Sequence, residues 1–441
     1  MRGREVSEPD VDEADVNEPD VDDPRAIGSE PTGSGADGPE LIGNEPPALG
    51  RDRVIQGYLL ASVVSNCGDT VFTIGLAWTA VHLLSPVLAG LVVGVDMLPQ
   101  AALTLAGGVI ADRFDTRRVM LLGLALRVGV LAAALVAWCG GFHSGVVLFA
   151  VAIGFGTASG LSAPASATLV RQLVQADDLV TVGGWFQVGS RLSRLMGAPL
   201  GAGIVAAGGM AGSMTVDAVS FVGVAIVLIF VVRPRFRLQK AGHEPWRKTL
   251  GEGLRYIWST PVTRTFVLGL AALNVFVSPV EALGVALRVS HSGWGSSWLG
   301  IAEATLACGA IGGSILGIRW QGQFLARRAF WTLVTQGVGL GLVGVDLRAT
   351  LVIGMLLIGV TSGLASVWLS GCFLRVVAPS HLGRVSSVSQ LGDLLLIPVM
   401  TPVFGALAGH ASVTTATLVF GACMSVLCLT FVLRPEISGL R

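Results

Sequence analysis

The sequence predicts an all-α protein that crosses a membrane many times, and three observations lead to this fold class. Of its 441 residues, 52% are hydrophobic and 13% are charged, whereas about a quarter of the residues in a soluble domain are charged. Apolar runs near or above about 18 residues, long enough to cross a bilayer as a helix, recur along the chain after residue 54. Arginine concentrates in every second connection between these runs, as in cytoplasmic loops.

Residues 1–50 form a separate segment before the first apolar run. They contain 14 acidic and 3 basic residues, are rich in proline and glycine, and have almost no large apolar side chains. Such a segment cannot bury enough surface to fold alone. We therefore expect a disordered, acidic cytoplasmic tail. This composition fits a solvated tail without a role or a tail that binds a partner. It also fits a segment that is translated only from an upstream start codon.

The apolar runs predict twelve transmembrane helices. The spans are residues 56–83, 88–110, 119–139, 145–169, 180–207, 212–232, 265–288, 295–317, 329–345, 349–373, 384–409 and 413–433. Basic residues lie mainly in the even-numbered connections, and the odd-numbered connections contain only Arg288 and Arg348. Because positive charge stays on the cytoplasmic side, we expect a multi-pass protein of the cell (inner) membrane with both termini in the cytoplasm.

A charged turn lies between the second and third spans, where residues 107–118 read GGVIADRFDTRR. It contains three arginines and two aspartates between two membrane-length apolar runs. Charges are unfavourable inside hydrocarbon, so the turn is expected at the membrane surface. Its excess of arginine places that surface in the cytoplasm.

This turn resembles the loop between helices 2 and 3 of the major facilitator superfamily, whose pattern is G-x-x-x-D-R-x-[GD]-R-[RK]. With one additional residue, the pattern is filled by Gly108, Asp112, Arg113, Asp115, Arg117 and Arg118. The resemblance implies a cytoplasmic gate in which Asp112 faces the start of helix 11 near Arg384, where unpaired N–H groups favour an anion. A simple anchor of positive charge would explain the arginines but not Asp112.

Two copies of one unit follow one another in the chain. The tripeptide that begins at residue 187 starts twelve residues before Pro199, and a similar tripeptide that begins at residue 390 starts twelve residues before Pro402. Further short matches between the two halves of the chain are separated by 201–205 residues. We therefore predict two six-helix bundles, residues 54–233 and 264–434, related by an axis along the membrane normal. The two halves of major facilitator transporters are arranged in this way.

Residues 234–263 separate the two predicted bundles. Basic residues alternate there with Trp246, Leu250, Leu254 and Trp258, which is typical of a basic amphipathic helix on a membrane surface. A positively charged tether and a helix that couples the gates both fit this pattern.

Ionisable residues inside predicted spans are the best candidates for a transport site. Asp69 lies near the middle of the first span, and Asn66, three residues earlier, shares its helical face. The resemblance implies that this helix lines the central cavity. A desolvated carboxylate can bind and release a proton near neutral pH, so proton coupling or substrate binding is one hypothesis for Asp69. A structural hydrogen bond to a neighbouring helix is the other.

Further acidic candidates are Glu281, Glu303 and Asp393, while Asp96 falls in the second span. Arginines 127, 191 and 194 also fall in spans. Opposite charges at depth usually pair, which predicts ion pairs between helices or gate contacts. The sequence does not indicate which acid meets which arginine.

Prolines and glycines inside spans predict bent helices and close approach between helices. The residues concerned are Pro99, Gly197, Pro199, Gly201 and Pro402. The segment 197–203 loosely resembles the glycine–proline signature in helix 5 of drug/proton antiporters. Ordinary packing of small residues is the simpler interpretation of the same pattern.

No enzyme, cofactor or metal site is predicted. The glycine-rich stretches lack the Lys-Ser or Lys-Thr of a phosphate loop, and the six histidines lack metal-ligand spacing. Nothing in the sequence predicts a nucleic-acid partner. The expected partners are a small-molecule substrate, protons and the lipid bilayer, and the expected state is a monomer.

Within the superfamily, the chain resembles the branch of macrolide-efflux and enterobactin-exporter proteins. The resemblance rests on residues 66–69, 98–99, 107–118, 162–165 and 383–385 and on Asp217 with Ser220-Phe221. It implies proton-coupled efflux of a drug-like or natural-product molecule by alternating access. A metabolite importer of the same fold and a non-transporting membrane sensor that uses the acidic tail are the alternatives.

Overall fold

A computed structural model describes residues 40–41, 47–104, 115–237, 246–320, 322, 324–378 and 381–434. Almost all of this is helical. The long helices are α1 (Arg53–Leu83), α2 (Pro86–Val95, followed by helical residues 97–104), α4 (Thr116–Cys139), α5 (Gly145–Leu173), α6 (Leu179–Phe230), α7 (Trp246–Ser259), α8 (Pro261–Pro279), α10 (Ser297–Arg319), α11 (Leu325–Val343), α12 (Arg348–Val376), α13 (Leu382–His410) and α14 (Val413–Val432). A π-helical turn, η3 (Val280–Gly284), joins α8 to α9 (Val285–His291).

Ten helical segments of the described chain are long and apolar enough to cross a membrane. The expected all-helical, multi-pass fold is therefore confirmed. One of the ten, Thr181–Phe230, covers most of two predicted spans, residues 180–207 and 212–232. The chain reverses there at Gly209, whose φ of 56° is a left-handed conformation that glycine adopts without a Cβ clash. The predicted span 329–345 corresponds to α11, which is not among the ten.

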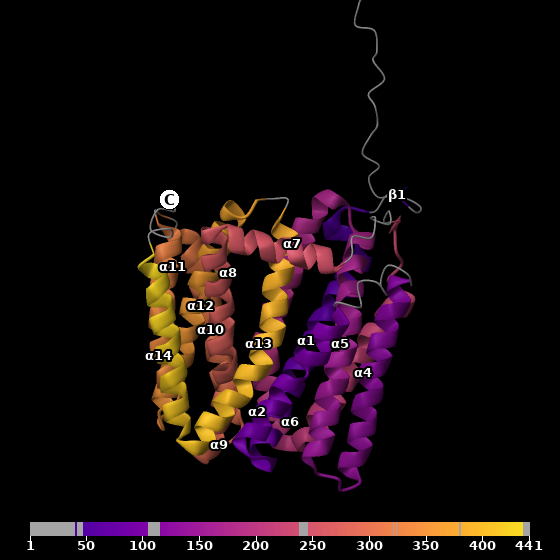
Figure 1. Cartoon of the computed structure of the whole chain (residues 1–441). Helices are drawn as coiled ribbons and strands as arrows, with labels where there is room; N and C mark the ends of the chain where they lie inside the picture. The colour runs from indigo at the N-terminus through magenta and orange to yellow at the C-terminus, as the bar shows by residue number, and fades with distance from the viewer. Residues whose placement is uncertain are drawn as a thin grey trace, which may run out of the picture.

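The helices pack as two groups that stand side by side in Figure 1. The N-terminal bundle comprises α1, α2, α4, α5 and α6, and its closest pairing is α1 with α6. The C-terminal bundle comprises α8 to α14, in which α10 packs on α12 and α11 packs on α12 and α14. We call the end where α1 starts and α14 stops the terminal face, and the opposite end the distal face.

The two bundles meet closely in the distal half, where α13 packs on α2. A Cβ atom on Gly90 would lie 2.7 Å from the carbonyl oxygen of Thr401, and one on Gly94 would lie 3.0 Å from the Cα of Pro398. Helices of membrane proteins approach this closely only where small residues face the partner. Pro398 and Pro402, which lie inside α13, remove backbone hydrogen bonds and favour its bend.

At the terminal face, α7 lies across the ends of the spans (Figure 1). The two-residue strands β1 (Glu40–Leu41) and β2 (Phe236–Arg237) pair antiparallel there. Residues 40–41 of the predicted acidic tail thus meet the predicted linker. Most of that tail, residues 1–39 and 42–46, lies outside the described residues. The gate residues Gly108, Asp112 and Arg113 lie outside them as well.

Charged side chains fasten the N-terminal bundle at the terminal face. The Asp52 carboxylate caps α1 by accepting hydrogen bonds from the N–H groups of Val54 and Ile55, and it also binds the Arg235 guanidinium. Arg117 donates to the carbonyl oxygen of Leu228 at 2.7 Å, near the end of α6. The Asp52 cap and the Arg117 hydrogen bond each satisfy backbone groups that a helix end leaves unpaired.

Candidate functional site

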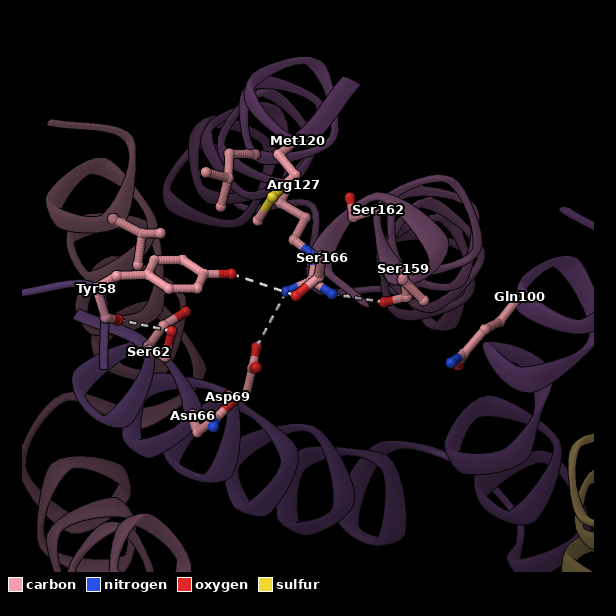
Figure 2. A pocket seen from close by; sticks show the side chains of 14 residues that line it. Tyr58, Ser62, Asn66, Asp69, Gln100, Met120, Arg127, Ser159, Ser162 and Ser166 are labelled. Atoms are coloured by element: carbon pink, nitrogen blue, oxygen red, sulfur yellow. Dashed lines mark hydrogen bonds and ion pairs between the residues drawn. The ribbon is translucent and has the colours of Figure 1, made fainter. Parts of the chain in front are cut away.

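A stripe of polar side chains runs along one face of α1. Tyr58, Ser62, Asn66 and Asp69 are spaced three or four residues apart, and Ser65 lies three residues after Ser62 and four before Asp69, which places all five on one side of a helix. Figure 2 shows the labelled members of this stripe facing α4 and α5 across a cavity. The cavity has a volume of about 280 Å³, and we call it the side cavity.

The opposite wall of the side cavity comes from α5 and α4. The α5 residues Ser159, Ser162 and Ser166 also follow a spacing of three or four and line the cavity. Arg127 of α4 reaches in from its own helix (Figure 2). The Tyr58 hydroxyl lies 3.3 Å from the Ser166 hydroxyl, so α1 and α5 are joined across the cavity.

An ion pair between Asp69 of α1 and Arg127 of α4 lies at the edge of the side cavity. The Arg127 Nη1 atom lies 3.7 Å from the Asp69 Oδ1 atom, and Nη2 donates to the Ser159 hydroxyl at 2.6 Å. The Arg127 guanidinium carbon lies 4.8 Å from the ring centre of Phe221, a cation–π arrangement. Its Nε atom is buried and has no hydrogen-bond partner among the described residues.

A second carboxyl group lies behind Asp69, on α6. Asp217 is fully buried, and its Oδ1 atom accepts from the Ser220 hydroxyl at 3.4 Å. Its Oδ2 atom has no hydrogen-bond partner within the described chain. A Cβ atom on Gly68 would lie 2.8 Å from Asp217 Oδ1, so the glycine beside Asp69 provides the space for this carboxyl group.

A larger cavity of about 400 Å³ lies between the two bundles, and we call it the central cavity. Asn66 and Asp69 line it as well as the side cavity. From the C-terminal bundle come Glu281 and Glu303, while Arg194 comes from α6 of the N-terminal bundle. Glu281 lies in the π-helical turn η3, an irregularity that often occurs at functional sites.

A third cavity, of about 170 Å³, touches the same ion pair. Asp69, Arg127 and Phe155 line it together with Asp96, and we call it the inner cavity. Asp96 lies where α2 gives way to helical residues 97–104. Its Oδ1 atom is buried without a hydrogen-bond partner in the described chain. Asp69 thus borders all three cavities.

Several predicted site residues have other surroundings. Asp393 accepts a hydrogen bond from the Asn274 amide at 2.9 Å, within the C-terminal bundle, and lines none of the three cavities. Arg384 pairs with Glu252 of α7 at 3.2 Å. Asp115 caps α4 by accepting from the N–H of Arg118 at 3.0 Å.

The predicted bending residues of helix 5 lie at helix contacts. A Cβ atom on Gly197 would lie 3.0 Å from the Cys67 carbonyl oxygen of α1, and one on Gly201 would lie 3.0 Å from the Val71 Cα. Pro199 lies inside α6 and faces Gly300 of α10. These contacts fit the simpler interpretation of the segment as close packing of small residues. Pro99 lies in helical residues 97–104, against Gly156 of α5.

The hydroxyl groups of the side cavity were not among the predicted site residues. Asn66 and Asp69 were, but Tyr58, Ser62 and the serines of α5 were not, because single serines in a span are common. Their signal was the spacing: polar residues recur every three or four positions on both predicted spans. Asp217 was part of the family resemblance without an assigned role.

Comparison with known proteins gives the chain a family. The model of the Major Facilitator Superfamily matches residues 58–392. The multidrug efflux pump Tap of Mycobacterium tuberculosis is 28% identical over 281 residues, 59% of this chain. The match spans 65% of that relative's length, just under two thirds. Tap of Mycolicibacterium fortuitum is 26% identical over 409 residues, 87% of this chain and 96% of the relative.

Solved structures support the same fold. The crystal structure of a POT family transporter in complex with 5-aminolevulinic acid superposes with a TM-score of 0.69 at 14% identity, covering 89% of this chain and 98% of the other. The resemblance expected from the charged turn is thereby confirmed, and the relatives named above are multidrug efflux pumps.

Proposed function

The chain belongs to the major facilitator superfamily, and on that premise we propose that it is a proton-coupled exporter of small organic molecules. Membership makes it a membrane transporter rather than an enzyme. The proposed direction rests on the names of its relatives, which are multidrug efflux pumps. The proposed coupling to protons rests on the carboxyl groups inside the spans.

The observation that carries the proposal is the Asp69–Arg127 ion pair at the meeting point of three cavities. Its position lets one carboxylate contact both the side cavity and the central cavity between the bundles. When Asp69 takes up a proton, its attraction to Arg127 is lost, and the guanidinium is free to find another partner. A proton or a substrate at this position therefore changes how α1 is held against α4.

We propose that transport proceeds by rocking of the two bundles about the central cavity. The tight glycine contacts between α2 and α13 favour a distal face that is closed in the present state. In the proposed topology the chain crosses the inner membrane twelve times, with α6 and the Gly209 reversal providing two crossings. Both termini and the acidic tail then lie in the cytoplasm, and the transporter acts as a monomer.

The test is transport by the purified protein in liposomes with an imposed pH gradient. Wild type should move a fluorescent drug against its gradient only while the pH difference lasts. In Asp69→Asn the rate of gradient-driven movement should fall at least tenfold, because the amide cannot take up a proton. Asp177→Asn, an exposed aspartate at the terminal face, should transport like wild type.

Three results would contradict the proposal. Gradient-driven transport that persists in Asp69→Asn would remove Asp69 from the coupling. Substrate movement in the opposite direction would favour an importer instead. A protein that moves none of a broad drug panel, but whose cellular effect requires residues 1–50, would favour the sensor.

A further inference from the structure

Arginines without counter-charge stand at the terminal face of the C-terminal bundle, where its helices begin or end. Six of them are exposed to solvent: Arg255 of α7, Arg319 of α10, Arg327 and Arg328 of α11, Arg375 of α12 and Arg434 after α14. None of the six forms an ion pair with another residue that the structure describes. We call these six side chains the arginine rim.

Negative charge is scarce at this end of the C-terminal bundle. Among its described residues the acid is Glu252, which already pairs with Arg384 at 3.2 Å. At the same face of the N-terminal bundle, exposed Asp115 and Asp177 accompany the exposed arginines. Like charges gathered on a surface repel one another and attract an anionic partner. The arginine rim is therefore the part of the terminal face that favours a partner of negative charge.

Arg255 belongs to the rim because α7 is fixed to the C-terminal bundle. A Cβ atom on Gly253 would lie 2.9 Å from the Arg384 carbonyl oxygen at the start of α13. The Tyr256 hydroxyl accepts a hydrogen bond from the N–H of Ala378, after α12, at 3.3 Å. These contacts hold α7 against the ends of α12 and α13. Arg255 therefore stays with the other arginines of the rim if the bundles move relative to one another.

The predicted acidic tail is attached to the other bundle. Strand β1 pairs with β2, and Phe236 of β2 is buried. The preceding residue, Arg235, donates its N–H to the Gln172 carbonyl oxygen of α5 at 2.8 Å, and its guanidinium binds Asp52 at the start of α1. The point at which residues 1–39 join the structure is thereby held on the N-terminal bundle, at the same face as the arginine rim.

Residues 1–39, which lie outside the described residues, match the rim in charge and length. They contain 12 acidic and 3 basic residues, and eight of the acids fall in two similar runs, residues 8–13 and 18–23. A chain of this length can span at most about 130 Å. Six helices side by side, at interaxial distances of about 8–10 Å, measure roughly 50–60 Å. The tail is therefore long enough to reach the opposite bundle.

We infer that residues 8–23 of the acidic tail bind the arginine rim of the C-terminal bundle. Exposed ion pairs are individually weak, but a tethered partner is present at an effective concentration in the millimolar range. The tail is the anionic partner that the chain itself carries to this face. Because its attachment point lies on one bundle and the rim on the other, the contact ties the two bundles together at the terminal face. It does not depend on which molecule the protein transports.

Photochemical cross-linking of the full-length protein tests this contact directly. Val21, between acids of the second run, is replaced by the photoreactive residue p-benzoylphenylalanine. The protein is placed in nanodiscs of phosphatidylethanolamine and phosphatidylglycerol, irradiated, and its cross-linked peptides are identified by mass spectrometry. The tail should cross-link to peptides that contain the arginine rim. In 1 M salt, where the Debye length is about 3 Å, the yield should fall at least fivefold.

Two double variants with the same change of charge separate the rim from the rest of the terminal face. Arg255→Gln with Arg319→Gln removes two charges from the rim and should lower the cross-linking yield at least threefold. Arg51→Gln with Arg53→Gln removes two exposed arginines beside the start of α1 and should give the wild-type yield. All four side chains are exposed, and equal melting temperatures confirm that both variants are folded.

Three outcomes would overturn the inference. Cross-links to phospholipid alone would show that the membrane surface, and not the tail, occupies the arginine rim. Cross-links between two chains would assign the tail to a second copy of the protein. An equal loss of yield in the two double variants would show that the tail follows the overall charge of the terminal face. Transport does not enter this test, so a protein that forms the contact but exports nothing would contradict the proposed function alone.

Discussion

The N-terminal and C-terminal bundles differ in how they pair the charges that line their cavities. In the N-terminal bundle, Asp69 has Arg127 within its own set of helices, and the two border a polar cavity. In the C-terminal bundle, Glu281 and Glu303 face the central cavity, and the arginine that lines it with them, Arg194, belongs to the other bundle. The N-terminal bundle therefore contains a self-contained charge pair, whereas the C-terminal acids depend on the interface.

Glycine contacts differ between the α10–α12 pairing of the C-terminal bundle and the helices around the side cavity. In the former, Cβ atoms on Gly313 and Gly359 would lie 2.1 and 2.2 Å from backbone carbonyl oxygens of the neighbouring helix. Beside the side cavity, Gly68 and Gly123 face side chains, those of Ser220 and Ser162. Backbone-to-backbone packing leaves no space between helices, whereas side chains between helices leave room for a cavity. The comparison indicates rigid packing of α10 on α12 and looser packing of the helices that border the side cavity.

The largest expected effect comes from breaking the charge pair of the N-terminal bundle. Arg127→Gln leaves Asp69 and Asp217 without their nearest guanidinium. Because the pair is partly exposed, the cost should lie between those of surface and buried pairs, about 1–3 kcal/mol of unfolding free energy. Gradient-driven transport should fall at least tenfold. Arg171→Gln, at an exposed arginine in the last turn of α5, is the control, and wild-type transport by Arg127→Gln would contradict the comparison.

A smaller effect should follow from disturbing the glycine packing of the C-terminal bundle. In Gly313→Ala the new methyl group would meet the Val360 carbonyl oxygen, and such overpacking costs about 1–3 kcal/mol. The adjacent Gly312→Ala has no atom within 4 Å of its new Cβ and should gain up to about 1 kcal/mol from helix propensity. Thermal unfolding in detergent measures both. Equal melting temperatures would show that the bundle adapts and is not rigid.

The smallest effect concerns the helix cap at the terminal face. Burial raises the pKa of Asp52, but the hydrogen bond and charge of Arg235 and two backbone N–H groups outweigh it and hold the pKa below 3.8. A lowered native pKa means that the contribution to stability is complete above pH 3.8 and is lost as the pH falls through the native value.

Asp52→Asn should therefore lower the melting temperature by a similar amount from about pH 5 to pH 8, with a cost of about 0.5–2 kcal/mol. The difference from wild type should shrink as the pH falls below 3.8. A difference that grows on acidification would contradict this sign. If Asp52→Asn also lowered the rate of transport, the cap would affect the cavities as well as the stability of the fold.

Sequence alone was sufficient for the class of fold, the family and most of the helix positions. The spans follow from hydrophobic length, which is a local property, and the reversal at Gly209 falls between two predicted spans. The interior candidates Asp69, Asn66, Glu281 and Glu303 all border the central cavity, and their role in proton coupling or substrate binding stays a prediction. They could be selected because a charge or an amide in an apolar run is conspicuous. The charged turn indicated the family through its spacing.

Only the tertiary structure decided which residues meet. The pairing of Asp69 with Arg127, the place of Asp217 behind Gly68 and the joining of two serine-bearing helices around one cavity depend on how helices cross. Helix crossing is set by the summed packing of many side chains on several helices, so no local spacing encodes it. Hydrophobic length and charge bias determined where the chain enters the membrane, and packing between helices determined which polar groups it brings together there.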